Sequence, residues 1–163
     1  MFDLTNFYKN GFCIIHNFFE NKEIYDMQNT FKEYANIFFN EKAFCLSEID
    51  DQNLASLYKN YKKNNPAASS CVYDSLQTSV VLQNLMTSKK TITAIAEVLK
   101  INPIFISHFF RTVRIDFNGD NPNELDWHQD FMTSEKVDSD ARRGIAIWAP
   151  LQDFNAERGS LEL

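Results

Sequence analysis

The stretch ELDWHQDFM, residues 124–132, places a histidine and an aspartate two positions apart between aromatic residues. In a β-strand, side chains at positions i and i+2 point to the same face, roughly 6.6 Å apart along the chain. The imidazole of His128 and the carboxylate of Asp130 could therefore bind a single cation. The first question is which metal chemistry such a pair serves.

A second histidine from a distant strand would complete the two-histidine, one-carboxylate site of non-haem iron(II) oxygenases, which leaves coordination positions open for co-substrate and dioxygen. A zinc site usually needs more protein ligands, and no cysteine lies near the pair. A divalent-metal hydrolase would need a further acidic or histidine cluster, which the sequence lacks. On the spacing alone, a surface histidine that pairs with a carboxylate remains an open alternative.

The elements that must position this pair change in kind along the chain. Residues 11–19, GFCIIHNFF, form a compact apolar run that predicts a buried strand. Helices are then predicted over 22–39, capped by Asn21, over 50–63, over 73–87, and over 89–100, capped by Ser88. Two of them have a predicted apolar face: Ile24, Met27, Phe31, Tyr34 and Phe38 in the first, and Ile92, Ile95, Ala96 and Leu99 in the last. The segment 64–70, NNPAASS, is expected to interrupt the helical pattern.

The second half of the chain is richer in β-branched and aromatic residues. Segments 104–117 and 144–154 have the composition of strands, and polar loops separate them from the His-x-Asp pair. Helices followed by strands predict an α+β protein, and 163 residues suit a single domain over 1–163.

Composition and charge exclude several classes of protein. The net charge of −6 argues against a general nucleic-acid or membrane-surface binder. No apolar run approaches the ~20 residues of a membrane span, and the first residues do not form a secretory signal. The odd number of cysteines without paired spacing indicates reduced thiols. We therefore expect a cytoplasmic protein that acts on a small molecule, without nucleic-acid or membrane partners.

The order of motifs resembles one family. An aromatic-flanked His-x-Asp, a polar loop, an apolar strand with a Trp, and the Gly-Ser turn of GIAIWAPLQDFNAERGSLEL (144–163) resemble the phytanoyl-CoA dioxygenase-like iron(II)/2-oxoglutarate oxygenases. The opening NGFCIIHNFFENKEI (10–24) is also similar to the start of that family. The resemblance implies a helical N-terminal layer on an incomplete jelly-roll barrel, the cupin-like double-stranded β-helix.

The resemblance also implies roles for individual residues. His128 and Asp130 would be iron(II) ligands, while Trp148, Thr112 and Arg114 would line the 2-oxoglutarate pocket. Halogenating relatives have a small residue in place of the aspartate, so Asp130 implies hydroxylation of a small organic substrate, coupled to decarboxylation of 2-oxoglutarate.

The sequence departs from the family at its end. The family's second iron-binding histidine and its 2-oxoglutarate-binding basic residue lie beyond GSLEL, where this chain stops. His16 and His108, on apolar segments, are interpreted as hydrogen-bonded core residues rather than substitutes. We therefore expect the N-terminal part of a dioxygenase domain, inactive alone, whose open strand edges favour self-association. The alternative is a non-catalytic jelly-roll remnant that acts as a binding or interaction module.

Overall fold

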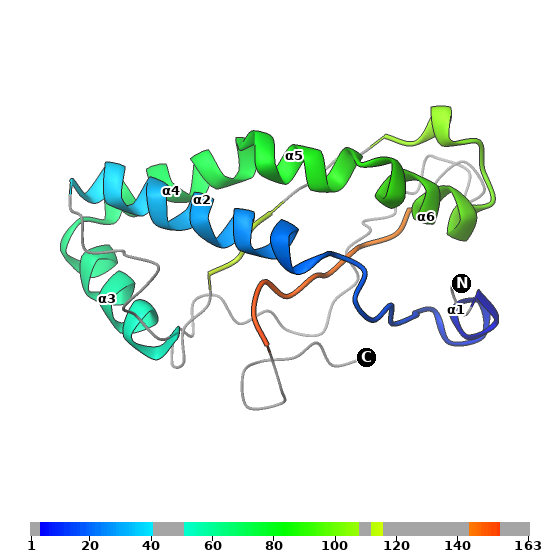
Figure 1. Ribbon diagram of the computed structural model, residues 1–163, viewed down its shortest axis with the longest axis horizontal. Helices are drawn as coiled ribbons and strands as arrows, with labels where there is room; N and C mark the ends of the chain where they lie inside the picture. Colours follow the sequence, from blue (N-terminus) through cyan, green and yellow to red (C-terminus); the bar gives the residue numbers. More distant parts are fainter. Residues whose placement is uncertain (1–3, 41–50, 108–111, 116–143, 154–163) are drawn as a thin grey trace, which may run out of the picture.

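The computed structural model describes residues 4–40, 51–107, 112–115 and 144–153. Within these ranges the chain forms six α-helices and one 3-10 helix (Figure 1). The elements are α1 (Leu4–Asn10), α2 (Asn21–Phe39), α3 (Asp51–Asn64), α4 (Pro66–Thr78), α5 (Val80–Thr87), α6 (Lys89–Leu99) and η1 (Pro103–Phe105).

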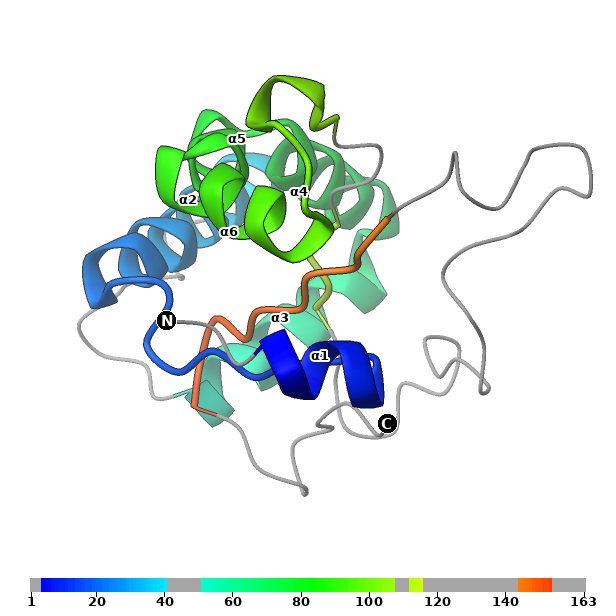
Figure 2. The same ribbon diagram turned by 90° about the vertical axis from the view of Figure 1, so that its right-hand side faces the viewer.

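The helices form an elongated layer. α4, α5 and α6 follow one another along its length, and α2 lies alongside α4 and α5 (Figure 1). α3 packs against α4 at one end of the layer. Two extended segments, residues 112–115 and 144–153, run along one side of this layer, as the view turned by 90° shows (Figure 2). The helices therefore support the two segments that carry the predicted co-substrate residues Thr112, Arg114 and Trp148.

The core lies where α2, α3 and α4 meet, and Tyr58 of α3 is at its centre. Tyr58 is only 1 % exposed, and its ring contacts Phe31 and Phe39 of α2 at centroid distances of 5.2 and 5.6 Å. Its hydroxyl shares a hydrogen bond of 3.0 Å with the Ser69 hydroxyl on α4. Aromatic packing and one buried polar pair therefore join the three helices.

The long helix α2 matches its predicted extent to within one residue. The predicted cap Asn21 is wrong by one position, because Glu23 Oε2 accepts a hydrogen bond from the Glu20 backbone N–H at 2.7 Å, which makes Glu20 the N-cap. Of the predicted apolar stripe, Met27 is buried, Phe31, Tyr34 and Phe38 pack against the core, and Ile24 is half-buried.

The expected interruption at residues 64–70 is confirmed only at Asn65, because α3 ends at Asn64 and α4 already begins at Pro66. Asn65 caps the helix by accepting a hydrogen bond from the Ala68 N–H at 3.1 Å, and Pro66 occupies the first turn. Proline is tolerated at that position because the first N–H groups of a helix have no intrahelical acceptor. Ser79 ends α4 and caps α5, so the predicted helix over 73–87 is divided in two.

The predicted cap of α6 is confirmed. The Ser88 hydroxyl accepts a hydrogen bond from the Thr91 N–H at 3.1 Å. The predicted inner face of Ile92, Ile95, Ala96 and Leu99 is only partly right: Ala96 is buried, but the other three are half-buried. The remaining buried positions of this helix are Thr91, Ala94 and Val98.

The expected α+β jelly-roll barrel is wrong for the part of the chain that the structure describes. Helices account for 68 % of those residues, and none of them forms a β-strand. Residues 103–105 form a 3-10 helix, while 112–115 and 144–153 are extended without a ladder partner among the described residues. Composition does not show whether a neighbouring strand is present to share the hydrogen bonds that a strand requires.

The predicted buried strand over residues 11–19 is also wrong. This segment is a loop that joins α1 to α2, with a left-handed backbone at Asn17 (φ 53°) that interrupts any regular strand. Ile14 is 71 % exposed, and His16 is exposed rather than a core residue. The described helices include none with the length and apolar character to cross a bilayer.

Candidate functional site

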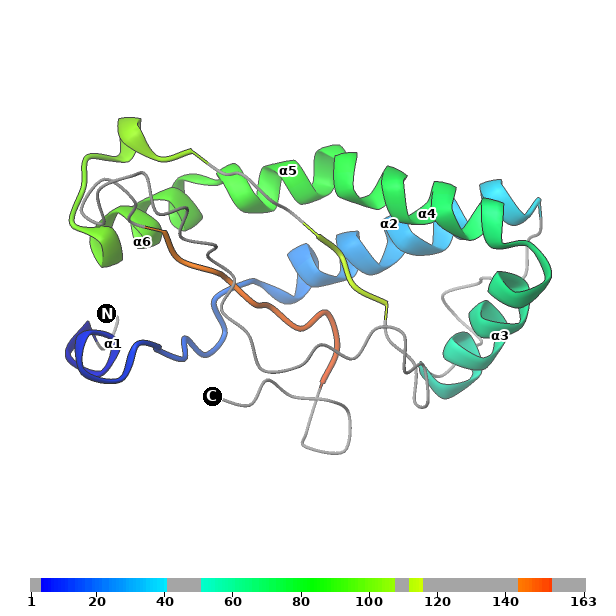
Figure 3. The same cartoon turned by 180° about the vertical axis from the view of Figure 1, so that it is seen from behind.

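The two extended segments dock on the helical layer through apolar side chains. Val113, only 8 % exposed, belongs to the core cluster, and Ile115 and Leu151 pack against it. Seen from behind, both segments cross the same side of the layer (Figure 3). The helical core therefore fixes one face of each segment and leaves the other face for other contacts.

Thr112 and Arg114 lie on that other face of the first segment. Both side chains are exposed, while Val113 between them is buried, which is the alternation of an extended chain with one face on a core. That they line a 2-oxoglutarate pocket remains a prediction. The position is chemically suitable, since an exposed guanidinium can form paired hydrogen bonds with a carboxylate.

Trp148 lies on the second segment and is 44 % exposed. Its neighbours Ala146 and Ile147 are exposed as well, so this stretch presents an apolar surface. At that exposure Trp148 is not part of the apolar core. A half-exposed indole suits the wall of a pocket, because it offers a large apolar surface and one N–H donor.

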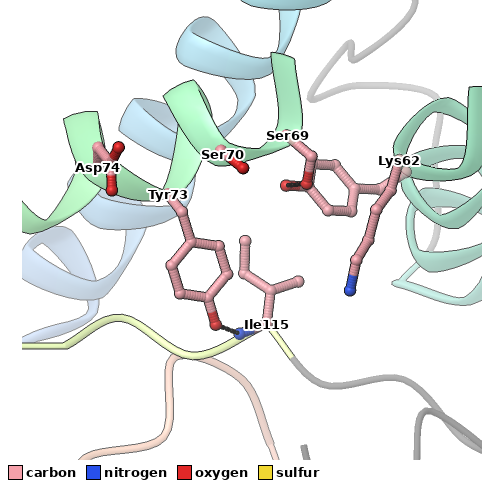
Figure 4. Close-up of a pocket in the computed structure, with 7 residues that line it drawn as sticks. Lys62, Ser69, Ser70, Tyr73, Asp74 and Ile115 are labelled. Atoms are coloured by element: carbon pink, nitrogen blue, oxygen red, sulfur yellow. Dashed lines mark hydrogen bonds between the residues drawn. The ribbon is translucent and has the colours of Figure 1, made fainter. Parts of the chain in front are cut away.

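Two helical side chains bind the backbones of these segments, and neither was predicted from the sequence. The Tyr73 hydroxyl on α4 accepts a hydrogen bond from the Ile115 N–H at 2.9 Å (Figure 4). The Gln28 side-chain amide on α2 donates a hydrogen bond to the Leu151 carbonyl. Both are half-buried polar residues that directly follow a buried apolar residue in the sequence. This placement is a weak sequence signal for a structural role.

A cleft of about 350 Å³ lies beside the first of these hydrogen bonds. Lys62 of α3 and Asp74 of α4 stand at opposite ends of it, with Tyr73 and Ile115 between them (Figure 4). The remaining lining residues are Tyr58, Ser69 and Ser70. Burial raises the pKa of the Tyr58 phenol, the hydrogen bond with Ser69 opposes this rise, and nearby Tyr73 adds to it.

A second cleft, of about 370 Å³, lies where α1, the end of α6 and the start of segment 144–153 meet. The Tyr8 hydroxyl donates to the Val98 carbonyl at 2.6 Å, and the Lys100 ammonium lies 4.2 Å from the Tyr8 ring centroid. The other lining residues are Phe7, Leu99, Gly144 and Ile145. The hydrogen bond and the cation–π contact hold α1 against the end of α6, which is a structural role.

A comparison with protein-family models matches residues 7–163 to the phytanoyl-CoA dioxygenase (PhyH) family. The match covers almost the whole chain, including both extended segments and the His-x-Asp pair. The chain belongs to this family. Searches of curated proteins and of solved structures find no significant match.

PhyH proteins are dioxygenases, and the family is known for dependence on iron(II) and 2-oxoglutarate. His128 and Asp130 lie outside the described residues, as does His108. Within the described ranges, no group of three or more His, Cys, Asp or Glu residues could hold a metal ion. The donor types of the His-x-Asp pair nevertheless suit iron(II), which accepts imidazole nitrogen and carboxylate oxygen together.

Proposed function

We propose that this PhyH protein serves an iron(II)- and 2-oxoglutarate-dependent hydroxylation of a small organic substrate, with His128 and Asp130 as iron ligands. The observation that carries the proposal is the family match over residues 7–163, which includes the His-x-Asp pair. When bound, iron(II) and 2-oxoglutarate would supply the oxidising chemistry with dioxygen.

The chain's own residues would bind iron(II) and orient the co-substrate. The His128 imidazole would donate a nitrogen lone pair in its neutral form, so iron binding would weaken where this histidine is protonated. The Asp130 carboxylate would occupy a position that halogenating relatives keep open for a halide. This carboxylate supports hydroxylation rather than halogenation as the outcome.

Co-substrate binding is proposed for the exposed face of the extended segments. The Arg114 guanidinium would pair with a carboxylate of 2-oxoglutarate, and the Thr112 hydroxyl on the same face would add a hydrogen bond. Trp148 would cover the apolar methylene groups of the co-substrate and exclude water. The exposure of all three side chains supports this assignment, since each can reach a ligand without moving the helical core.

Equilibrium dialysis under argon tests the proposal without requiring turnover. The 163-residue chain is dialysed against iron(II), with and without 2-oxoglutarate, and compared with His128→Ala and Asp130→Ala. Each substitution is expected to weaken iron binding at least about ten-fold, because even outer-shell changes at metal sites cost that much. His16→Ala is the matched control, since His16 is an exposed loop residue of the described chain.

The co-substrate arm uses Arg114→Gln, with the exposed Lys89→Gln of α6 as its control. Arg114→Gln should weaken 2-oxoglutarate binding to the iron-loaded chain. Iron binding in the absence of 2-oxoglutarate should stay unchanged. Iron binding that does not depend on His128 or Asp130 would contradict the metal assignment. Such a result would favour a non-catalytic binding role for the chain.

A further inference from the structure

We propose that Tyr73 and Gln28 are positioning residues that fix the register of the two extended segments on the helical layer. This inference deepens the proposed function and rests on it, because these segments carry Arg114 and Trp148. Neither Tyr73 nor Gln28 would touch iron or 2-oxoglutarate. Each would act through the backbone that it binds.

Apolar docking alone does not set the register. Val113 and Ile115 pack on the core through contacts that have little directional preference. A slip of one residue would place the charged Arg114 side chain on the core and expose Val113, and both changes are unfavourable. A slip of two residues that brings Ile115 to the place of Val113 would keep an apolar side chain on the core and would displace Arg114 by roughly 6.6 Å along the chain.

The hydrogen bond to Tyr73 distinguishes between such registers. The Tyr73 hydroxyl meets one particular amide, that of Ile115, at 2.9 Å, and the two residues are 42 positions apart in sequence. The amide belongs to the residue that follows Arg114. Because the bond is directional and to a single atom, it identifies one register and places the Arg114 side chain on its exposed face.

Gln28 plays the same part for the second segment. Its side-chain amide donates to the Leu151 carbonyl, 123 positions away, and Leu151 also packs against the core. Trp148 lies three residues before this anchor. The two anchors come from neighbouring helices, α2 and α4, which pack directly against each other. A rigid helical pair therefore holds both segments and defines the separation of Arg114 and Trp148.

The two anchors also satisfy backbone groups that lack a strand partner among the described residues. A buried or half-buried peptide N–H or C=O without a partner is costly, so an extended segment needs an acceptor or donor beside it. Here half-buried side chains on α2 and α4 supply them. The helices thus replace, at these two atoms, the contacts that a neighbouring strand would make.

The first test follows the Ile115 amide directly. Tyr73→Phe removes only the hydroxyl, and amide hydrogen exchange by NMR should show the Ile115 N–H exchanging about five- to ten-fold faster, the factor expected for one hydrogen bond. Tyr8→Phe is the matched control, because it removes a tyrosine hydrogen bond between α1 and α6. Unchanged Ile115 exchange in Tyr73→Phe would overturn the inference.

The second test follows Trp148 through fluorine-19 NMR of the chain labelled with 5-fluorotryptophan. Trp127 and Trp148 are the only tryptophans, so Trp148→Phe assigns the two signals. Gln28→Met keeps the length of the side chain and should shift or broaden the Trp148 signal. Gln83→Met is the control, since the Gln83 amide donates a hydrogen bond to the nearby Thr78 carbonyl within the helical layer. An unaltered Trp148 signal in Gln28→Met would overturn the inference.

The third readout separates this inference from the proposed function. If the iron-loaded chain binds 2-oxoglutarate, Tyr73→Phe and Gln28→Met should weaken that binding about five- to ten-fold while iron binding stays unchanged. Binding equal to that of the unmodified chain would overturn the positioning role. If the unmodified chain binds no 2-oxoglutarate, the proposed co-substrate role of Arg114, Thr112 and Trp148 in this chain fails, and the Ile115 and Trp148 signals alone decide whether the register is set as described.

Discussion

Replacing Tyr58 by phenylalanine removes one oxygen atom from the centre of the helical core. The ring contacts with Phe31 and Phe39 can remain, since these depend on the aromatic ring. What disappears is the 3.0 Å hydrogen bond to the Ser69 hydroxyl. Ser69 is only 6 % exposed, so water can replace the lost partner only from the side of the cleft that Tyr58 and Ser69 line.

The size of the effect follows from that burial. A buried hydroxyl left without a partner costs about 1–3 kcal/mol, so Tyr58→Phe should lower the free energy of unfolding by about 1–2 kcal/mol. Ser69→Ala should cost slightly less, because alanine favours the helix by roughly 0.5 kcal/mol over serine. The double variant leaves neither group unpaired, so its loss should fall below the sum of the single losses by about 1 kcal/mol.

Urea unfolding followed by circular dichroism measures all four proteins of this cycle. The slope of the free energy of unfolding with urea should stay constant, which shows that the four chains unfold the same surface. Ser75→Ala on the same helix serves as a control for helix propensity. Strict additivity of the two single losses would refute the reasoning, because it would mean that Tyr58 and Ser69 stabilise the core independently.

Three further outcomes follow from the helical layer. The pKa of Tyr58 is raised by burial, so the folded chain holds this proton longer than the unfolded chain, and thermal melts should show stability falling above about pH 10, a loss that Tyr58→Phe abolishes. The pKa of Glu23 is lowered by hydrogen bonds from Lys90 and then from the Glu20 backbone, so the native state binds fewer protons. Its contribution to stability is present above pH 4.5 and lost as pH falls through the folded pKa, a step that Glu23→Gln should remove from acid titrations. Asn65→Ala should lower the free energy of unfolding by about 1 kcal/mol, whereas Asn65→Gly should cost only a few tenths, as measured by urea unfolding.

Much of the helical layer could be predicted because its signals are local. The apolar stripe of α2 and the Ser88 cap of α6 depend on residues three or four positions apart, and both are seen in the structure. Pro66 shows the limit of a local rule, since proline ends a helix in its interior and begins one in its first turn. Asn65 before it was the signal that distinguishes the two cases.

The extended segments could not be predicted to the same degree. Residues 112–115 have the composition of a strand, but composition does not show whether a partner strand lies beside them. The anchors Tyr73 and Gln28 bind atoms 42 and 123 positions away, a separation that no local pattern encodes. The His-x-Asp pair was predicted from three consecutive residues, and it stays a prediction because both residues lie outside the described ranges.

The most direct test of the iron assignment observes the histidines themselves. The chain contains three, so nitrogen-15 NMR of the imidazoles can follow each one during addition of iron(II) under argon, well below one equivalent. The assignment predicts that the His128 signals broaden first, and that Asp130→Ala abolishes this broadening while leaving His16 unaffected. An equal response from all three histidines, or a His128 response that survives Asp130→Ala, would contradict a shared iron site.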